Sequence, residues 1–395
     1  MSMYSLALAA MDRQPTASLP FITRLETWYK AHTRTHTLPP EYRGLSLDEV
    51  HQALGVGRLR FVVPYALRLR GVEVRATCDG QEIFHAYEPE IENFPGMWDY
   101  VANDQPGVTL SELVTPRGKL HLQHGLVAEN VITGTEPYLK EHLIKDSADY
   151  RIVEYILERA EFVERFDALY AEQNRLGPDA FVVPLVHRLP FQQVLLEYLG
   201  ETPLFYALHD DPRPVERLLG LLDEQLTGIL EKLEPLRAPY VEFPDNLHGM
   251  MTNPRLFQRY CLPQLQHYTG LLHAQGKKAG SHTDGDVKPL LKLLASSGLD
   301  VCESVSPAPL TPATIEQIWE AWQAGPVIWG AIPTPILEER TPEEEFRAYI
   351  ERLLDIVGQG PVILGLVDLF MRHNSIERVK YIVARLRASA SPVPL

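Results

Sequence analysis

The stretch KKAGSHTDGD, residues 277–286, contains the turn that decides the fold of this chain. The run 278–281 predicts a short buried strand, and His282, Asp284 and Asp286 follow it where a helix is expected to begin. In parallel α/β folds, ligands gather at the carboxyl ends of the strands. The stretch therefore predicts a β/α unit with a functional site at its turn.

The same order of strand, turn and helix recurs through the second half of the chain. Short apolar runs precede turns rich in Gly, Pro, Asp or Asn, and amphipathic segments follow, which is typical of parallel β/α units. Asn253 and Pro254 predict the start of one helix, and residues 341–345 predict the start of another. The expected strands are 181–186, 240–243, 278–281, 300–304, 327–330 and 362–366.

These units, with a further strand expected at 60–65, favour a distorted (β/α)8 TIM barrel in the α/β class. The alternative, a doubly wound open sheet, lacks the support of a G-x-G-x-x-G turn. No long Gly/Ser or Pro linker interrupts the sequence. We therefore expect a single structural domain overall.

The first 150 residues follow a different pattern. Residues 72–84 and 108–121 alternate in the manner of β-hairpins, and 146–166 predicts a helix with Ser147 as its cap and Asp149 in its first turn. We expect an N-terminal extension of hairpins and helices that packs on the barrel and contributes to it. The predicted division is an extension over residues 1–150 and a barrel body over residues 151–395.

Composition and charge limit the classes of function. The 395 residues, 45% of them hydrophobic, can bury a core, and the three scattered cysteines suit a reducing cytoplasm better than a disulfide framework. The sequence has neither a basic segment before its apolar N-terminus nor a run of about eighteen apolar residues, which argues against secretion and membrane insertion. A net charge of -15 without a Lys/Arg cluster argues against nucleic acid. We expect a cytoplasmic protein that binds a small molecule or a protein partner.

Polar residues follow several expected strands, and a barrel would bring them to one mouth. A buried carboxylate needs a partner or a metal ion to offset its desolvation, so an acid within an apolar run is a functional candidate. Glu303, beside Cys302, and Asp368, within 362–370, are of this kind. The full set of strand-end candidates is Asp245, Asn246, His248, His282, Asp284, Asp286, Glu303 and Asp368.

Each candidate also has a structural explanation. Asp284 and Asp286 could cap the following helix, and Asp245 could simply form a turn. His282 could be a buried histidine with satisfied hydrogen bonds, although a carboxylate two residues away would be a costly neighbour in a dry core.

Two more candidates close the first expected strand. His187 and Arg188 could bind an anionic group of a substrate, or Arg188 could pair with a surface carboxylate. The sequence leaves both explanations open.

With these residues assembled, the chain resembles the uroporphyrinogen decarboxylase superfamily, which includes cobalamin-linked methyltransferases and is related to cobalamin-independent methionine synthase. The resemblance covers about residues 107–387. It implies a distorted (β/α)8 barrel with its site at the C-terminal mouth, in agreement with the strand pattern. The most specific segments are 116–120, 144–157 with Asp149 and Tyr150, 273–286, 298–309, 327–333 and 362–368.

The chain departs from the decarboxylases of this superfamily. They carry an M-R-Q-A-G-R-like segment near the N-terminus and a histidine in a G-H-G-like turn near the C-terminus, and neither is present here. The nearest basic cluster does not reproduce the spacing; it consists of Arg58, Arg60, Arg68 and Arg70. This departure puts porphyrinogen decarboxylation in doubt.

The chain also departs from the methyltransferases, which bind zinc through His-x-Cys and a distant cysteine. His282 matches the first position, Asp284 replaces the cysteine, and the distant position falls near Val367 or Asp368. Oxygen ligands in place of thiolates make a harder, more Lewis-acidic metal centre.

Together these features predict a metal-assisted methyltransferase or demethylase that acts on a small methylated substrate, with a corrinoid or thiol as acceptor. A divalent metal, with zinc the first candidate, would be bound by His282, Asp284, Glu303 and Asp368. The catalytic residues would be Glu303, Asp284 and Asp245, and the substrate contacts His187, Arg188, Asn246 and His248.

Two alternatives stay open. The first is a cofactor-free decarboxylase of the uroporphyrinogen decarboxylase type, in which Asp245 or Asp284 stabilises a cationic pyrrole-like intermediate. The second is a noncatalytic barrel that binds a ligand. A corrinoid protein is the expected partner of a methyltransferase, and the sequence does not decide whether the chain forms a homodimer.

Overall fold

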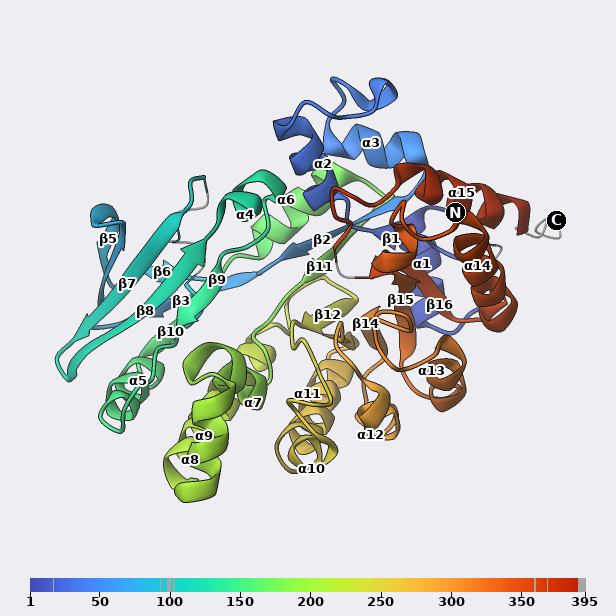
Figure 1. Ribbon diagram of the computed structural model, residues 1–395. Helices are drawn as coiled ribbons and strands as arrows, with labels where there is room; N and C mark the ends of the chain where they lie inside the picture. Colours follow the sequence, from blue (N-terminus) through green and yellow to red (C-terminus); the bar gives the residue numbers. More distant parts are fainter. Residues whose placement is uncertain are drawn as a thin grey trace. The chain divides into compact units, whose positions relative to one another are not determined.

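The computed structural model describes residues 1–16, 18–92, 94–97, 101, 104–358, 360–367 and 369–389. Contacts divide the chain into two compact units (Figure 1). The parallel-strand unit comprises Met1–Val62, Leu169–Leu185 and Ala238–Leu395, and the antiparallel unit comprises Val63–Ala168 and Val186–Arg237. Both units are discontinuous in sequence, so this division differs from the predicted one at residue 150. The expectation of a single domain stays a prediction.

The parallel-strand unit contains two parallel sheets, which confirms the α/β class. The larger sheet has its five strands in chain order: β12 (Tyr240–Phe243), β13 (Lys278–His282), β14 (Val301–Val305), β15 (Val327–Pro333) and β16 (Val362–Val367). The smaller sheet has the order β1 (Ile22–Thr23), β2 (Gly57–Val62) and β11 (Ala180–Pro184). Most of these strands lie close to the predicted ones. Two differ: β1 was not predicted, and the strand expected at 60–65 is divided between β2 and β3 (Tyr65–Leu69).

The two parallel sheets meet at both of their edges. An isolated parallel bridge joins Phe21 to Leu364, and another joins Leu185 to Glu242. The amide of Leu364 also donates to the carbonyl of Pro20 at 2.8 Å. Each edge of the larger sheet is therefore bridged to an edge of the smaller one.

Helices follow the strands as the sequence predicts. Asn253 caps its helix by accepting from the amides of Arg255 and Leu256, and Pro342 is the N-cap of α14. The helical segments of this unit are α1 (Met3–Met11), α2 (Glu26–Arg34), a 3-10 turn (Pro40–Tyr42), α3 (Leu47–Leu54), most of α6 (Phe166–Leu176), α10 (Pro254–Leu256), a π-helix (Phe257–Cys261), α11 (Leu262–Ala274), a 3-10 turn (Lys288–Leu290), α12 (Leu291–Ala295), α13 (Ile315–Ala321), a 3-10 turn (Thr334–Leu337), α14 (Glu343–Val357) and α15 (Ile376–Ser389).

The core of this unit lies near the amino ends of the strands. Phe181 packs against Tyr240 and Trp329, with ring centroids 6.1 Å and 5.5 Å away. Ala7 and Ala10 of α1 join the same buried cluster. Because bulky side chains fill the amino-end half, polar side chains are left to the carboxyl ends of the strands.

The antiparallel unit contains two antiparallel sheets. One has the order β10 (Ala160–Glu164), β3, β6 (Glu90–Ile91), and the other β5 (Gln81–Tyr87), β4 (Glu73–Cys78), β7 (Gly107–Thr115), β8 (Gly118–Leu126), β9 (Tyr138–Glu141). Both predicted hairpins are confirmed. The helical segments are α4 (Ala128–Thr133), α5 (Asp149–Leu157), α7 (Pro190–Gln193), a π-helix (Val194–Tyr198), α8 (Glu201–Asp210) and α9 (Arg213–Lys232).

The continuous helix predicted at 146–166 is wrong. Helix α5 ends at Leu157, and β10 pairs antiparallel with β3 from Ala160 onward. Ser147 is not the cap, because Ala148 holds the N-cap position without a side-chain bond. Asp149 lies in the first turn as predicted. The pairing of β10 with a strand some ninety positions earlier decides its structure, and local helix propensity does not register such a partner.

Cys78, Cys261 and Cys302 are all buried and unpaired. Among the described residues, every helix is too short or too polar to cross a bilayer.

Candidate functional site

His282 and Glu303 form the centre of the candidate site. They are register partners on β13 and β14, so their side chains project to the same side of the sheet. Nδ1 of His282 is hydrogen-bonded to the carboxylate of Glu303, which is only 7% exposed. The backbone amide and hydroxyl of Thr283 both donate to the carbonyl oxygen of Glu303 at 2.8 Å, which fixes the two strands at this point.

Glu242 on β12 adds a second buried carboxylate. It is fully buried, and its register partner is Gly280, two residues before His282. One ligand atom each from Glu242, His282 and Glu303 lie within 4.8 Å of one another. The hydroxyl of Tyr240 donates to Oε2 of Glu242 at 2.7 Å, while Oε1 has no hydrogen-bond partner among the described residues.

Asp284 lies at the edge of this cluster. Its Oδ2 is 3.7 Å from Nε2 of His282 and accepts a hydrogen bond from Nδ2 of Asn246 at 3.0 Å. Asn246 has a φ of 51°, a left-handed conformation that asparagine adopts more readily than most residues. The structure therefore brings together the predicted residues His282, Glu303, Asp284 and Asn246.

Burial and the charges of the cluster shift the pKa values of His282 and Glu242. Burial alone would lower the pKa of His282, but the carboxylates of Glu303 and Asp284 outweigh it and raise that pKa well above 6.5. Burial, together with the negative charge of Glu303, raises the pKa of Glu242 to about 8. Without a metal ion at neutral pH, Glu242 therefore holds a proton and His282 carries a positive charge.

Arg24 supplies a positive charge from β1's carboxyl end. Its guanidinium carbon lies 5.3 Å from the centroid of the Phe61 ring, and its charge partly opposes the rise in the pKa of Glu242. The sequence analysis did not name Arg24 or Glu242 as a site residue, although Glu242 belongs to the stretch 242–248, which is rich in polar groups. The signal for Glu242 was a charged residue within the otherwise apolar strand YVEF.

The donor set fits a divalent cation. One imidazole nitrogen with two carboxylate oxygens suits zinc, manganese or ferrous iron. The buried Oε1 of Glu242, without a partner in the described part of the chain, is the kind of atom that a cation or a proton would satisfy. Asp368, the fourth predicted ligand, lies outside the described residues.

Asp245 is not brought to this cluster. It is fully buried, and its Oδ2 accepts a hydrogen bond from Ser281 at 2.8 Å. Ser281 and His282 are consecutive on β13 and therefore project to opposite faces of the strand. Asp245 is thus held on the face away from His282, and its predicted catalytic role stays a prediction.

The remaining predicted contacts are outside the cluster of Glu242, His282 and Glu303, although His248 lies beside Gly285 in the turn after β13. Nδ1 of His248 accepts from the amide of Met250 at 3.2 Å, in the turn after β12. His187 and Arg188 belong to the antiparallel unit. Arg188 donates to Glu197 at 2.9 Å, so its observed partner is a carboxylate of the protein. The substrate-binding roles of these three residues stay predictions.

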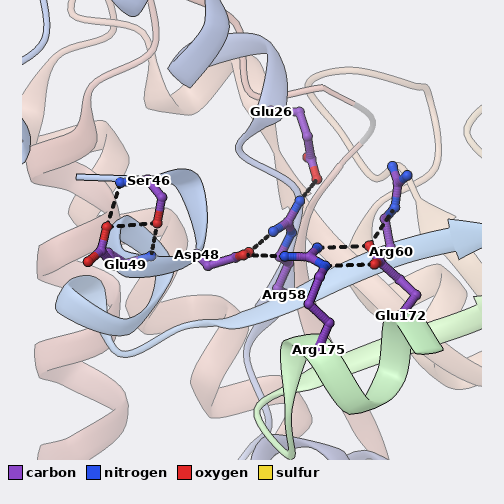
Figure 2. Close-up of polar contacts among 8 residues, drawn as sticks. All are labelled: Glu26, Ser46, Asp48, Glu49, Arg58, Arg60, Glu172 and Arg175. Carbon is purple, nitrogen blue, oxygen red and sulfur yellow. Dashed lines mark hydrogen bonds and ion pairs between the residues drawn. The ribbon is translucent and has the colours of Figure 1, made fainter. Parts of the chain in front are cut away.

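The four arginines of the basic cluster are also paired. Figure 2 shows Arg58 between Glu26 and Asp48, and Arg60 beside Glu172 at 3.3 Å. Arg175 completes the series of alternating charges, because it contacts both Asp48 and Glu172 at 2.8 Å. In the antiparallel unit, Arg68 pairs with Glu90, and Arg70 pairs with Glu88 and Glu161. These arginines serve internal ion pairs.

Comparison with known proteins identifies a solved structure that shares this fold. No family model and no curated protein sequence matches the chain. A methyltransferase from Methanosarcina mazei matches in structure with a TM-score of 0.58 at 12% identity, covering 99% of this chain and 100% of that one. A B12-independent methionine synthase from Shewanella sp. W3-18-1, in complex with selenomethionine, matches with a TM-score of 0.39 at 13% identity, covering 57% of this chain and 64% of that one. The first match shows a shared fold.

Proposed function

We propose that this chain is a metal-assisted methyltransferase or demethylase whose divalent cation is bound by Glu242, His282 and Glu303. The observation that carries the proposal is the convergence of these three side chains within 4.8 Å, with one buried carboxylate oxygen unpartnered in the described residues. Asp284 would be a further ligand or a hydrogen-bond acceptor for the substrate. Asp368 stays a proposed ligand from the sequence alone.

The fold supports this class of enzyme. The likeness to the methyltransferase from Methanosarcina mazei extends over the full length of that chain. The bridges Phe21–Leu364 and Leu185–Glu242 favour closure of the eight parallel strands into a (β/α)8 barrel. In such a barrel the ligands would lie at the C-terminal mouth, where TIM-barrel enzymes have their active sites. This agrees with membership of the uroporphyrinogen decarboxylase superfamily, which we propose from the sequence.

A cation bound here would supply Lewis acidity, with which it would polarise the methylated heteroatom or activate an acceptor thiol. The residues around it have distinct tasks. Glu303 orients the ring of His282 through Nδ1, and Asn246 holds the carboxylate of Asp284 near Nε2. Binding would release the protons of Glu242 and His282, since ligands must be deprotonated. Arg24 would attract an anionic group of the substrate.

We propose a small methylated compound as the substrate and a thiol, or a corrinoid supplied by a partner protein, as the acceptor. Carboxylates in place of the thiolates of the zinc-binding relatives favour a harder cation. Both acceptors are proposed from the resemblance in sequence.

Calorimetric titration of the metal-free protein with Zn²⁺ and Mn²⁺ tests the metal site. We expect binding by the wild type and a loss of at least about tenfold in His282→Ala and Glu242→Gln. Asp245→Asn is the matched control, because it alters a buried carboxylate on the other face of β13 and should keep wild-type affinity. A wild-type protein that binds neither cation would contradict the proposal.

Turnover tests the reaction. Methyl transfer from methylated amines, ethers and thioethers to a thiol or a free corrinoid should be measured with and without metal. The decarboxylase alternative has less support, because Asp245 faces away from the cluster and the four arginines are paired within the protein. Formation of coproporphyrinogen from uroporphyrinogen would nevertheless establish it, and binding without any turnover would favour the noncatalytic barrel.

A further inference from the structure

Tyr240 and Glu242 are linked within one strand. They are two residues apart on β12 and so project to the same face. Both are fully buried, and the Tyr240 hydroxyl donates to Oε2 of Glu242 at 2.7 Å. When Glu242 is ionised, this buried hydrogen bond is stronger than one between neutral groups, so it fixes the carboxylate's orientation.

The Tyr240 ring is itself held on two sides. Trp329 lies 6.3 Å away and Phe181 6.1 Å away, measured between ring centroids. On the third side Gly280 provides the space for the hydroxyl: a Cβ at that position would lie 1.8 Å from the Tyr240 oxygen. Any other residue at position 280 would displace the ring, so glycine there is a condition for the Tyr240–Glu242 contact.

The two oxygens of Glu242 therefore differ in their hydrogen bonding. Oε2 is occupied by Tyr240, whereas Oε1 is buried without a partner in the described part of the chain. We propose that Tyr240 is a positioning residue that makes Glu242 a monodentate ligand, with Oε1 as the metal-binding atom. This inference rests on the proposed function, because it concerns the same cation.

A fixed monodentate carboxylate would also discriminate between cations. Calcium takes six to eight oxygen ligands and commonly uses bidentate carboxylates, whereas zinc is satisfied by four ligands. Because Oε2 accepts the hydrogen bond from Tyr240, only Oε1 is left for the cation, and the site should favour zinc over calcium. Removal of the hydroxyl frees Oε2 and should weaken this preference.

The test is calorimetric titration of wild type, Tyr240→Phe and Tyr198→Phe with Zn²⁺ and, separately, Ca²⁺. Tyr198 is the matched control, since it is equally buried and its hydroxyl has no partner among the residues described. We expect Tyr240→Phe to lose about 10- to 100-fold in zinc affinity, with a smaller loss or a gain for calcium. Tyr198→Phe should match the wild type.

The outcomes separate this inference from the proposed function. Zinc binding by the wild type with unchanged affinity and selectivity in Tyr240→Phe would overturn the positioning role alone. No zinc binding by the wild type would overturn the metal-assisted function and this inference with it. Equal losses for both cations would indicate a general structural effect and would also overturn the inference. If Tyr240→Phe unfolds, Gly280→Ala provides the second test: its added Cβ displaces the Tyr240 hydroxyl while Glu242 keeps its full length and charge, and the same shift in selectivity is expected.

Discussion

Glu242 and Glu303 are two buried carboxylates that flank His282 from the strands on either side of β13, and the charge of Glu303 affects the ionisation of Glu242. Burial and the charge of Glu303 together raise the pKa of Glu242 to about 8. Two carboxylates held this close destabilise the metal-free protein and bind a cation more strongly for the same reason. The site therefore lowers the stability of the metal-free protein and raises its affinity for a cation.

Glu242→Gln should stabilise the metal-free protein increasingly as pH rises. The folded protein holds a proton on Glu242 up to about pH 8, while the unfolded chain releases it near 4.5. The wild type therefore loses unfolding free energy as pH rises between these values, and the variant does not. The difference should reach a few kcal/mol above pH 8, at about 1.4 kcal/mol per pKa unit.

Urea unfolding in EDTA at several pH values measures this difference. Added Zn²⁺ should reverse the order of stability, because only the wild type keeps all three ligands. A pH-independent difference between the two proteins would contradict the pKa assigned to Glu242.

Gly280→Ala should damage both the core and the site. The new Cβ would meet the Tyr240 hydroxyl at 1.8 Å, so the ring or the strand must move. We expect a loss of about 1–3 kcal/mol in unfolding free energy, typical of overpacking, together with weaker zinc binding. Gly270→Ala in α11 is the control, since a Cβ there meets nothing within 4 Å.

Thermal or urea unfolding compares the two glycine variants directly. Gly270→Ala should gain about 0.5–1 kcal/mol from helix propensity and bind zinc normally. A Gly280→Ala protein with wild-type stability and zinc affinity would mean that Tyr240 has room to move, contrary to the packing described.

The sequence allowed the strand ends to be located because local patterns determine them. Alternation of apolar runs with capped helices identified β12 to β16 within a few residues, and the cost of burying a carboxylate identified Glu303. Pairing between strands that are distant in sequence was harder to predict. β10 was taken for part of a helix because its partner β3 lies far earlier in the chain, and no local signal marks such a partner.

Side-chain direction within a turn was the second limit. Asp245 follows β12 as the prediction required, but after Pro244 the alternation of the strand no longer applies, and the side chain faces Ser281. Glu242 is inside the strand, and the alternation in YVEF places it with Tyr240 on one face. A search for acids within strands, rather than after them, would have found it.

The ion-pair series in Figure 2 predicts a strong effect of Arg58 on stability. Its side chain is 12% exposed and lies between Glu26 and Asp48. Arg58→Leu leaves these two carboxylates without their shared cation in a partly buried place, which should cost about 3 kcal/mol. Arg213→Leu, which removes an 86% exposed partner of Asp211, should leave the unfolding free energy nearly unchanged, because solvent screens exposed ion pairs.

Urea unfolding at low and high salt distinguishes the two arginine pairs. The Arg58 effect should persist in 1 M NaCl, because buried pairs are screened less than exposed ones. An Arg58→Leu variant as stable as Arg213→Leu would show that the series contributes little to folding.

His51 predicts a loss of stability in acid. Its ring is buried in α3, and burial lowers its pKa to about 4 from 6.5. Between these pH values His51 is protonated in the unfolded chain but not in the folded protein. The unfolding free energy therefore falls as pH decreases from 6.5 to about 4. At about 1.4 kcal/mol per pKa unit, His51 alone should account for about 3 kcal/mol.

Comparison of wild type with His51→Leu isolates this contribution, since all other titrating groups are common to both. The difference in unfolding free energy should change in favour of the variant as pH falls from 7 to 4, whatever the packing cost of leucine at neutral pH. His209→Leu makes the same substitution at an exposed position of α8 and serves as the surface control. Parallel profiles for wild type and His51→Leu would mean that His51 accepts a proton without unfolding, and that its surroundings open to water more easily than their burial indicates.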